Sequence, residues 1–264
     1  MPQPPAPHLD YQVSTLPYFR GLLRAVEARF YENIDLPAPT LDLGCGDGHF
    51  ATDAFDRHLE VGSDPWWGPL TEAAERGSYR ALVQSDGAAQ PFPDAYFSSA
   101  VSNSVLEHIP HLESVLIETA RLLQPGAPFV FCVPNHRLLS SLSIGRGLDK
   151  IGLHPLGNAY RAFFNRIARH HHCDDPKTWE TRLQKTGFRL EKWWHYFSPA
   201  ALRTLEWGHY FGLPALVSKK LTGRWIISPT HWNLALTKRL TRPYYEEPLA
   251  AEDGVYTFFI ARRL

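Results

Sequence analysis

Residues 40–50 read TLDLGCGDGHF, an apolar segment that runs directly into three glycines and then into a helical segment starting near His49. Glycines let the backbone turn sharply and approach a ligand with no Cβ in the way. The free N–H groups at the start of the following helix can bind an anionic or polar group. The stretch therefore predicts a strand, a glycine-rich turn and a helix that together hold a ligand.

Short apolar segments alternate with helical ones on both sides of this turn. Apolar residues at three- and four-residue spacing predict an amphipathic helix over Tyr18–Asn33. Strands that alternate with helices predict a parallel sheet covered on both faces. The expected strands are Thr40–Leu43, Leu59–Gly62, Arg80–Gln84, Phe97–Ser102, Phe129–Pro134, Arg189–Phe197 and Tyr256–Ala261. The expected helices between them lie near His49–Phe55, Leu70–Glu75, Leu112–Leu123 and 176–188.

The pattern predicts one domain over residues 1–264, with an α/β, Rossmann-like fold and a mostly parallel seven-stranded sheet. Residues 1–17 are expected to be a flexible arm, because the first ten are rich in proline. Residues 18–135 would form the cofactor-binding core. The strand–helix rhythm breaks over 136–175 and 198–255, which are expected to be irregular, lid-like insertions that cover the substrate.

Composition narrows the class of protein. The three cysteines are too few and too scattered for a disulfide framework, which favours a reducing compartment. No apolar run approaches the roughly 18 residues of a spanning helix, and the first ten residues lack the features of a signal peptide. A cytoplasmic protein is therefore expected.

Two carboxylates extend the glycine motif. Asp64 ends the second predicted strand and Asp86 follows the third, so both should lie at the carboxyl edge of the sheet, where ligands bind in such folds. Each could instead cap the helix that follows it. A nicotinamide cofactor normally uses a G-x-G-x-x-G turn, whereas the spacing here is G-x-G-x-G, and the third-strand Asp is not required for that cofactor.

Four successive motifs carry a family resemblance. They are LDLGCGDG (41–48), VGSDPW (61–66), SDGAAQPFPDAYFSSAVSNSVLEHI (85–109) and LLQPGAPFVFCVPN (122–135). Together they resemble the motifs of class I S-adenosylmethionine-dependent methyltransferases of the small-molecule type. The family often has an Asp at the start of the fourth strand, whereas this chain reads YFSSAVSNS. That departure removes a supporting carboxylate and none of the cofactor contacts that the resemblance implies.

The resemblance implies S-adenosylmethionine as cofactor and assigns residues to its two ends. The methionine part would be held by Asp42, by the turn glycines Gly44, Gly46 and Gly48, and by Asn103 and Ser104 after the fourth strand. The adenosine part would be held by Asp64 at the ribose hydroxyls, Pro65 and Trp66 along the adenine, and Asp86 at its amino group, with Gly87 and Ala88 beside it.

Histidines supply the candidates for acid–base chemistry, which is needed only where the acceptor must lose a proton. His136 follows the fifth strand, and His108 lies near the cofactor by resemblance, so these two are the candidate catalytic residues. Each could instead play a purely structural part. No metal is expected, because adjacent side chains in the run His170, His171 and His172 do not point toward one ion.

Charge is balanced overall, with 27 basic and 27 acidic residues, but not locally. Residues 136–172 hold six basic and one acidic residue, and 199–242 hold seven and one, the second stretch with interleaved aromatics. Such segments suit an anionic amphiphile or peripheral contact with an anionic membrane surface, or are simply the solvated outside of a small core. Zero net charge and the lack of a recognisable RNA-binding module argue against a nucleic-acid partner.

The sequence therefore predicts an enzyme that transfers a methyl group from S-adenosylmethionine to a small molecule, with a lipid-like or anionic acceptor as the narrower expectation. The alternative is a catalytically silent homologue that binds the cofactor as a sensor or partner protein. The glycine turn and both carboxylates are compatible with either function.

Overall fold

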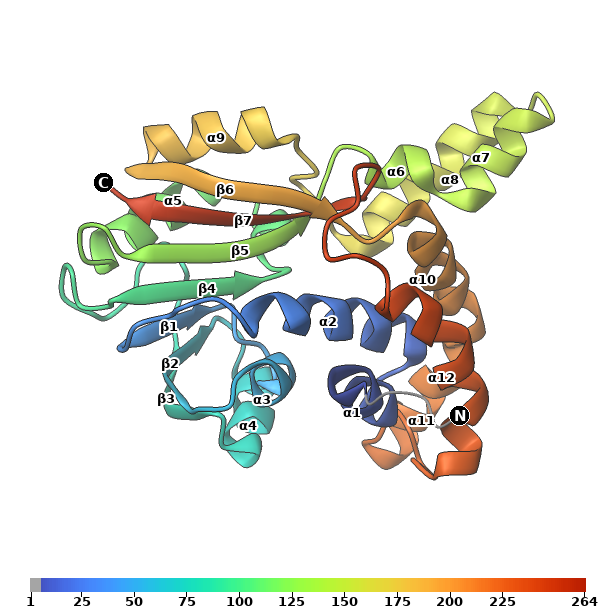
Figure 1. The fold of residues 1–264 in the computed structure, drawn as a ribbon, viewed down its shortest axis with the longest axis horizontal. Helices are drawn as coiled ribbons and strands as arrows, with labels where there is room; N and C mark the ends of the chain where they lie inside the picture. Colours follow the sequence, from blue (N-terminus) through green and yellow to red (C-terminus); the bar gives the residue numbers. More distant parts are fainter. Residues whose placement is uncertain (1–5) are drawn as a thin grey trace.

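The computed structural model describes residues 6–264, apart from the side chains at 213 and 231. Its centre is a seven-stranded sheet of order β3-β2-β1-β4-β5-β7-β6, in which only β7 is antiparallel to its neighbours (Figure 1). The strands are β1 (Thr40–Leu43), β2 (Leu59–Asp64), β3 (Tyr79–Gln84), β4 (Ser99–Asn103), β5 (Pro128–Pro134), β6 (Phe188–Tyr196) and β7 (Tyr256–Arg263). The predicted fold class is thereby confirmed.

Helices cover both faces of the sheet, and each face has its own apolar core. Strand β5 shows the division, because Val130 and Cys132 belong to one core while Phe129, Phe131 and Val133 belong to the other. Continuous burial of this kind is expected for a central strand. The first core includes residues of α2 (Tyr18–Tyr31), α3 (His49–Ala54) and α4 (Trp67–Arg76), and the second those of α5 (Leu112–Leu122) and α9 (Pro176–Lys185).

The predicted strands and core helices match the structure to within a few residues. Three strands differ by two residues at one end. β2 and β7 end at Asp64 and Arg263, later than predicted, and β4 begins at Ser99 and not at Phe97. Phe97 makes only an isolated bridge to Leu123 and is fully buried. Its apolar side chain belongs to the core without being part of the strand, which is why the apolar pattern overestimated the strand.

The predicted flexible arm over residues 1–17 is wrong for most of its length. Residues Pro7–Thr15 form helix α1, in which Leu9 and Val13 are each 1% exposed. Proline is tolerated in the first turn of a helix, so the Pro-rich start does not exclude one. The four-residue spacing of Leu9 and Val13 places both on the face that packs against α2. Residues 1–5 lie outside the described part of the chain.

The two stretches after β5 and β6 are helical, and the expectation that they are irregular is wrong. The first contains α6 (Leu138–Ser141), α7 (Ser143–Lys150) and α8 (His154–Ala168), and the second α10 (Pro199–Phe211), α11 (Leu213–Thr222) and α12 (His231–Tyr245). Figure 1 shows all six at the end of the sheet to which β4 and β5 point. Among the described residues, no helix is both long and apolar enough to cross a membrane.

One buried carboxylate connects α2 to the sheet. Glu27 is 0% exposed, and its Oε2 accepts hydrogen bonds from Asn103 Nδ2 at 2.7 Å and from Arg24 Nη1 at 3.3 Å. Its Oε1 accepts from Tyr196 Oη at 2.8 Å and from Ser104 Oγ at 3.1 Å. The carboxylate thus fixes the ends of β4 and β6 relative to α2, and nothing in the sequence pattern singled it out.

Replacing Glu27 should destabilise the whole domain. Glu27→Ala leaves the buried groups of Asn103 and Tyr196 without their acceptor, and we expect the free energy of unfolding to fall by roughly 3–5 kcal/mol. Glu27→Gln keeps one acceptor oxygen and should cost less. Chemical denaturation measures both, with the exposed Glu75→Ala, expected within about 0.5 kcal/mol of wild type, as the control. A loss for Glu27→Ala no larger than for the control would contradict this role.

Candidate active site

The glycine turn between β1 and α3 requires glycine for two separate reasons. Gly44, Gly46 and Gly48 have φ values of +78°, +56° and +71°, a backbone region that side chains with a Cβ rarely adopt. At Gly44 a Cβ would also lie 2.4 Å from Val105 Cγ1, so the loop after β4 packs directly against the turn. Gly48 closes the turn by donating its N–H to the Cys45 carbonyl.

Gly46 differs from Gly44 because its side-chain position is open. A Cβ built on Gly46 meets no atom within 4 Å, so the free space above the turn begins there. The Gly46 N–H donates to Asp64 Oδ2 at 3.0 Å, and the Trp66 N–H donates to Asp64 Oδ1 at 2.9 Å. Burial raises the pKa of Asp64, and these backbone bonds oppose that shift. Each oxygen keeps a lone pair for a further donor.

Asp42 lies at the base of the turn and is 5% exposed. Burial raises the pKa of its carboxyl group to about 6, although the hydrogen bond that Tyr79 Oη donates at 2.6 Å opposes the shift. A carboxylate with such a pKa is protonated in part under mildly acidic conditions. A cation placed beside it would favour the charged form.

A cavity of about 700 Å³ opens above the turn, a size typical of a site for a small ligand. Four of the residues predicted to bind the cofactor line it, namely Asp42, Gly44, Gly46 and Asn103. The other walls come from α2, the first half of α4, the loop after β4 and α11. The sequence-based prediction therefore identified residues of the floor. Among the described residues of the two segments predicted as covers, only those of 198–255 line the cavity, namely Lys219 and Trp225.

The residues predicted for the adenosine part lie outside this cavity, along the edge formed by β2 and β3. Asp64 pairs with Gln84 across these strands, so both strands end at the same edge. Trp66 is 71% exposed, and Asp86 is also exposed, with its Oδ1 accepting the Ala88 N–H at 2.9 Å. Pro65 and Gly87 are their chain neighbours, and a Cβ on Gly87 would lie 3.2 Å from Val115 Cγ1 on α5.

Asn103 and Ser104 have side chains that are already engaged. Asn103 donates to Glu27 and accepts the Cys132 thiol proton at its Oδ1, with 3.0 Å between Sγ and Oδ1, which fixes the orientation of the amide. Ser104 has φ +53° and also donates to Glu27. Asn103 is therefore a rigid part of the cavity wall. Ser104 does not line the cavity, and its bond to Glu27 helps to fix the chain next to Asn103.

Neither predicted catalytic histidine lines the cavity. His136 is exposed, and its ring centroid lies 6.3 Å from that of His195. His108 is also exposed, and its Nδ1 lies 3.1 Å from the carbonyl oxygen of Arg169. Neither ring is therefore part of the wall of this cavity.

His49 is the histidine that does line the cavity, and the sequence-based reasoning used it only to mark a helix start. It is 5% exposed, and its Nε2 lies 2.6 Å from Thr15 Oγ1 of α1. Burial lowers its pKa to about 4, so the ring is neutral. Its Nδ1 is buried without a hydrogen-bond partner. No local motif marks this position, because the contact with α1 spans 34 residues of sequence.

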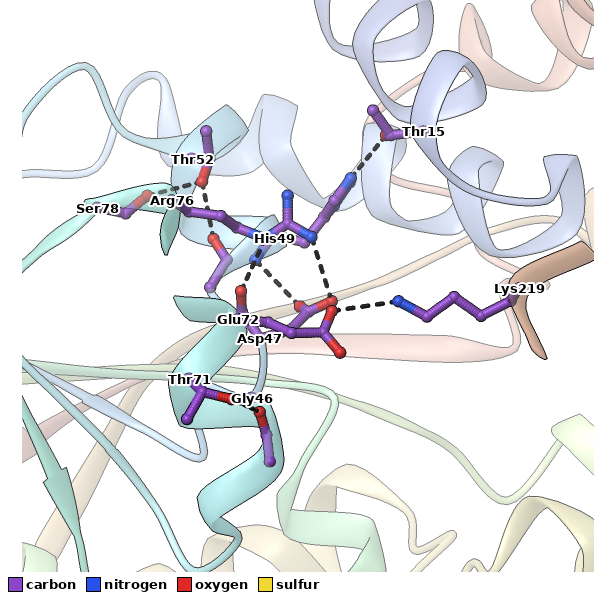
Figure 2. Close-up of polar contacts among 12 residues, drawn as sticks. Thr15, Gly46, Asp47, His49, Thr52, Thr71, Glu72, Arg76, Ser78 and Lys219 are labelled. Carbon is purple, nitrogen blue, oxygen red and sulfur yellow. Dashed lines mark hydrogen bonds and ion pairs between the residues drawn. The ribbon is translucent and has the colours of Figure 1, made fainter. Parts of the chain in front are cut away.

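Basic side chains from distant segments close the cavity. Lys219 of α11 forms an ion pair with Glu72 of α4 at 3.3 Å, and Asp47 beside them contacts Arg76 and the backbone of His49 (Figure 2). Arg20 and Arg24 of α2 also line the cavity. The guanidinium carbon of Arg20 lies 5.7 Å from the ring centroid of Trp225, another lining residue. The charge asymmetry of the sequence pointed to this segment without identifying which residues face the site.

Comparison with known proteins agrees with this geometry. Residues 41–131 match the family described as "Methyltransferase domain". Over 115 residues, 39% of this chain and 43% of the relative, the chain is 36% identical to trans-aconitate 2-methyltransferase of Methylobacterium nodulans. Over 118 residues, 42% of this chain and 49% of the relative, it is 30% identical to ubiquinone biosynthesis O-methyltransferase of Vibrio atlanticus. The matches thus span less than half the length of these curated relatives.

The fold extends the likeness beyond the matched segment. Geranyl diphosphate C-methyltransferase from Streptomyces coelicolor superposes with a TM-score of 0.57 at 12% identity, covering 94% of this chain and 82% of that chain. The sheet order, the glycine turn and the family match together define an α/β methyltransferase domain. Residues 41–131 thus carry a methyltransferase domain, and the fold of the chain is similar to that of S-adenosylmethionine-dependent methyltransferases, whose cofactor is S-adenosylmethionine.

Proposed function

We propose that this protein transfers the methyl group of S-adenosylmethionine to a small acceptor molecule that carries negative charge. The observation that carries the proposal is a cavity in which the glycine turn meets the basic cover. Asp42 and Gly46 line one side of this cavity, and Lys219 and Arg20 line the other. Trans-aconitate and geranyl diphosphate, which the names of two similar proteins mention, are likewise small molecules.

The methionine end of the cofactor fits the floor of the cavity by charge and by shape. That end carries an ammonium, a sulfonium and a carboxylate. The buried Asp42 carboxylate would favour the cationic groups, while Arg20 and Arg24 offer guanidinium groups for the carboxylate. The open space over Gly46, which a Cβ would begin to fill, lets the backbone approach the ligand closely. The amide of Asn103, held by two partners, bounds the same space.

The adenosine end would extend from the cavity along the edge of β2 and β3. The remaining lone pairs of Asp64 would accept the ribose hydroxyls. Pro65 and the exposed indole of Trp66 would lie along the adenine, and Asp86 would accept its amino group. Gly87 and Ala88 are the chain neighbours of Asp86, on the same edge.

Methyl transfer depends mainly on how the methyl donor and the acceptor are positioned. When bound, the cofactor supplies a methyl group on a sulfonium, whose neutral leaving group needs no acid. The acceptor's lone pair forms the bond to the methyl carbon while the carbon–sulfur electron pair stays on sulfur. The cover helices hold the acceptor in line and exclude water. An acceptor whose attacking atom is itself anionic needs no base, and for such an acceptor neither His136 nor His108 has a proton to remove.

The proposed activity is tested by offering the protein labelled methyl donor and fractionated small-molecule extracts. We expect label to be transferred with extract fractions that bind to an anion-exchange resin before the reaction, because these fractions hold the anionic acceptors. Gly46→Ala serves as the control, because its Cβ projects into the cavity, and it should lose transfer. Tight binding of S-adenosylmethionine with no labelled product from any fraction would favour the alternative of a cofactor-binding sensor. Label transfer only with fractions that do not bind the resin would contradict the anionic acceptor.

Cofactor affinity should depend on pH through Asp42. With a pKa of about 6, this group is mostly neutral at pH 5 and mostly charged at pH 7.5. A cationic ligand binds the charged form better, so we expect calorimetry to show S-adenosylmethionine binding about tenfold weaker at pH 5 than at pH 7.5. Asp42→Asn should bind more weakly at pH 7.5 and be nearly independent of pH.

Asp94→Asn is the matched control for this measurement, because Asp94 is exposed and pairs with Arg121 outside the cavity. It should keep the wild-type pH dependence. A wild-type affinity that is equal at pH 5 and pH 7.5, or an Asp42→Asn variant with the full dependence, would remove Asp42 from the binding site.

We also propose that the end of the molecule formed by α11 and α12 contacts anionic membrane surfaces. Seven apolar side chains there are between 54% and 78% exposed, namely Leu216, Val217, Leu221, Ile227, Trp232, Leu236 and Leu240. Trp232, Leu236 and Leu240 recur at four-residue spacing and so share one face of α12. The exposed basic residues Lys220, Arg224 and Arg239 lie in the same segment. Exposed apolar side chains among basic ones are typical of helices that lie in a lipid interface.

Vesicle sedimentation tests this surface. We expect binding to phosphatidylglycerol vesicles, little binding to phosphatidylcholine vesicles, and weakening with salt. Reversal of Lys220, Arg224 and Arg239 to Glu should abolish it. Lys219 is left unchanged because it lines the cavity, so reversing it would disturb the site as well. Equal reversal at the exposed residues Arg146, Lys150 and Arg166 of the first insertion is the control. Similar losses in both triple variants would refute a specific membrane face.

A further inference from the structure

Two segments far apart in the sequence meet beside the cavity. After β4 the chain forms a short 3₁₀ turn, Leu106–His108, and the segment that follows α8 crosses it. The backbone N–H groups of His171 and His172 donate to the Glu107 carbonyl oxygen, at 2.7 Å and 3.2 Å. These bonds bring His170 over the turn, where its ring centroid lies 5.3 Å from that of His108.

Three side chains converge at this crossing. Glu107, His108 and His170 each offer one ligand atom, and these three atoms lie within 4.8 Å of one another. Glu107 is 2% exposed, and its Oε2 has no hydrogen-bond partner. The Nδ1 atom of His170 is likewise buried without a partner. Buried polar atoms are nearly always satisfied in folded proteins, so two orphans at one point call for an explanation.

The orientation of His108 adds a third free ligand atom at the same point. Its Nδ1 lies 3.1 Å from the Arg169 carbonyl oxygen, so Nδ1 carries the proton and donates it in that bond. Its Nε2 then has a free lone pair, and this atom lies 3.7 Å from Glu107 Oε1. A histidine that binds a metal commonly donates its other N–H to a carbonyl or carboxylate in this way.

We propose that Glu107, His108 and His170 bind one divalent transition-metal ion of the Zn²⁺ type. Two imidazole nitrogens and one carboxylate oxygen favour such an ion over Mg²⁺ or Ca²⁺, which prefer sets of oxygen ligands. Three protein ligands leave a coordination position open. The proposal departs from the expectation that no metal binds. That expectation considered the three adjacent histidines together, whereas only His170 of that run takes part, with two residues more than 60 positions away.

The ion would join the first insertion to the loop after β4. Val105, two residues before Glu107, lines the cavity, so the ion would stand at the side of the cavity without being part of its floor. The proposal does not depend on methyl transfer, because its test reads metal binding directly.

Equilibrium dialysis of the purified chain against Zn²⁺, after treatment with a chelator, tests the site. We expect one ion per chain with an affinity in the micromolar range or tighter, and a rise in melting temperature on adding Zn²⁺. Co²⁺ in place of Zn²⁺ should show the visible absorption of a bound, low-coordinate ion. His170→Ala and Glu107→Gln should each weaken binding at least about tenfold and remove the thermal shift.

His171→Ala is the matched control, because His171 is the exposed neighbour of His170 and its side chain is not among the three ligands. It should bind like wild type. Circular dichroism of the metal-free variants checks that each is folded, and His108→Ala replaces Glu107→Gln if the buried substitution unfolds the chain. Absence of stoichiometric Zn²⁺ at 100 µM, or an equal loss in His171→Ala and His170→Ala, would overturn the proposal.

Discussion

The hydrogen bonds to the Glu27 carboxylate are the constraint on which the rest of the site depends. A carboxylate that is fully buried is costly unless its oxygens are satisfied, and here four side chains satisfy them. The same bonds fix α2 to the ends of two strands, because Asn103 is the last residue of β4, Ser104 comes directly after it, and Tyr196 is the last residue of β6. Since Arg20 and Arg24 belong to α2, the basic wall of the cavity is positioned by this one carboxylate.

The loop after β4 is held from three directions at once. Asn103 is locked between Glu27 and Cys132, Val105 packs against Gly44, and the Glu107 carbonyl accepts two N–H groups from the segment after α8. Side chains held by several neighbours keep their rotamers when a ligand arrives, which favours binding. The cavity wall and the proposed metal ligands thus share one short, rigid segment.

Sequence patterns predicted what is local and missed what is distant. The strands, the glycine turn and the carboxylates Asp64 and Asp86 follow from periodicity and from the rule that parallel strands end at one edge, whereas Asp42 and Asn103 were assigned through the family resemblance. Glu27 looked like an ordinary helix residue, because its bond to Tyr196 spans 169 positions. Lys219 belonged to a basic segment, but only the folded chain brings it within 3.3 Å of Glu72. Helix α1 was missed because proline was taken as a sign of disorder, although its first turn tolerates proline.

The ion pair between Lys219 and Glu72 bears on the proposed anionic acceptor, because it is weak. The two side chains are 32% and 43% exposed, so solvent screens the pair, and such pairs contribute about 0–1 kcal/mol. An acceptor that carries its own carboxylate or phosphate can therefore take over Lys219 at little cost in stability. The pair also joins α11 to α4 across the mouth of the cavity. A weak pair at that place would join α11 to α4 in the free protein and would yield readily to the proposed anionic acceptor.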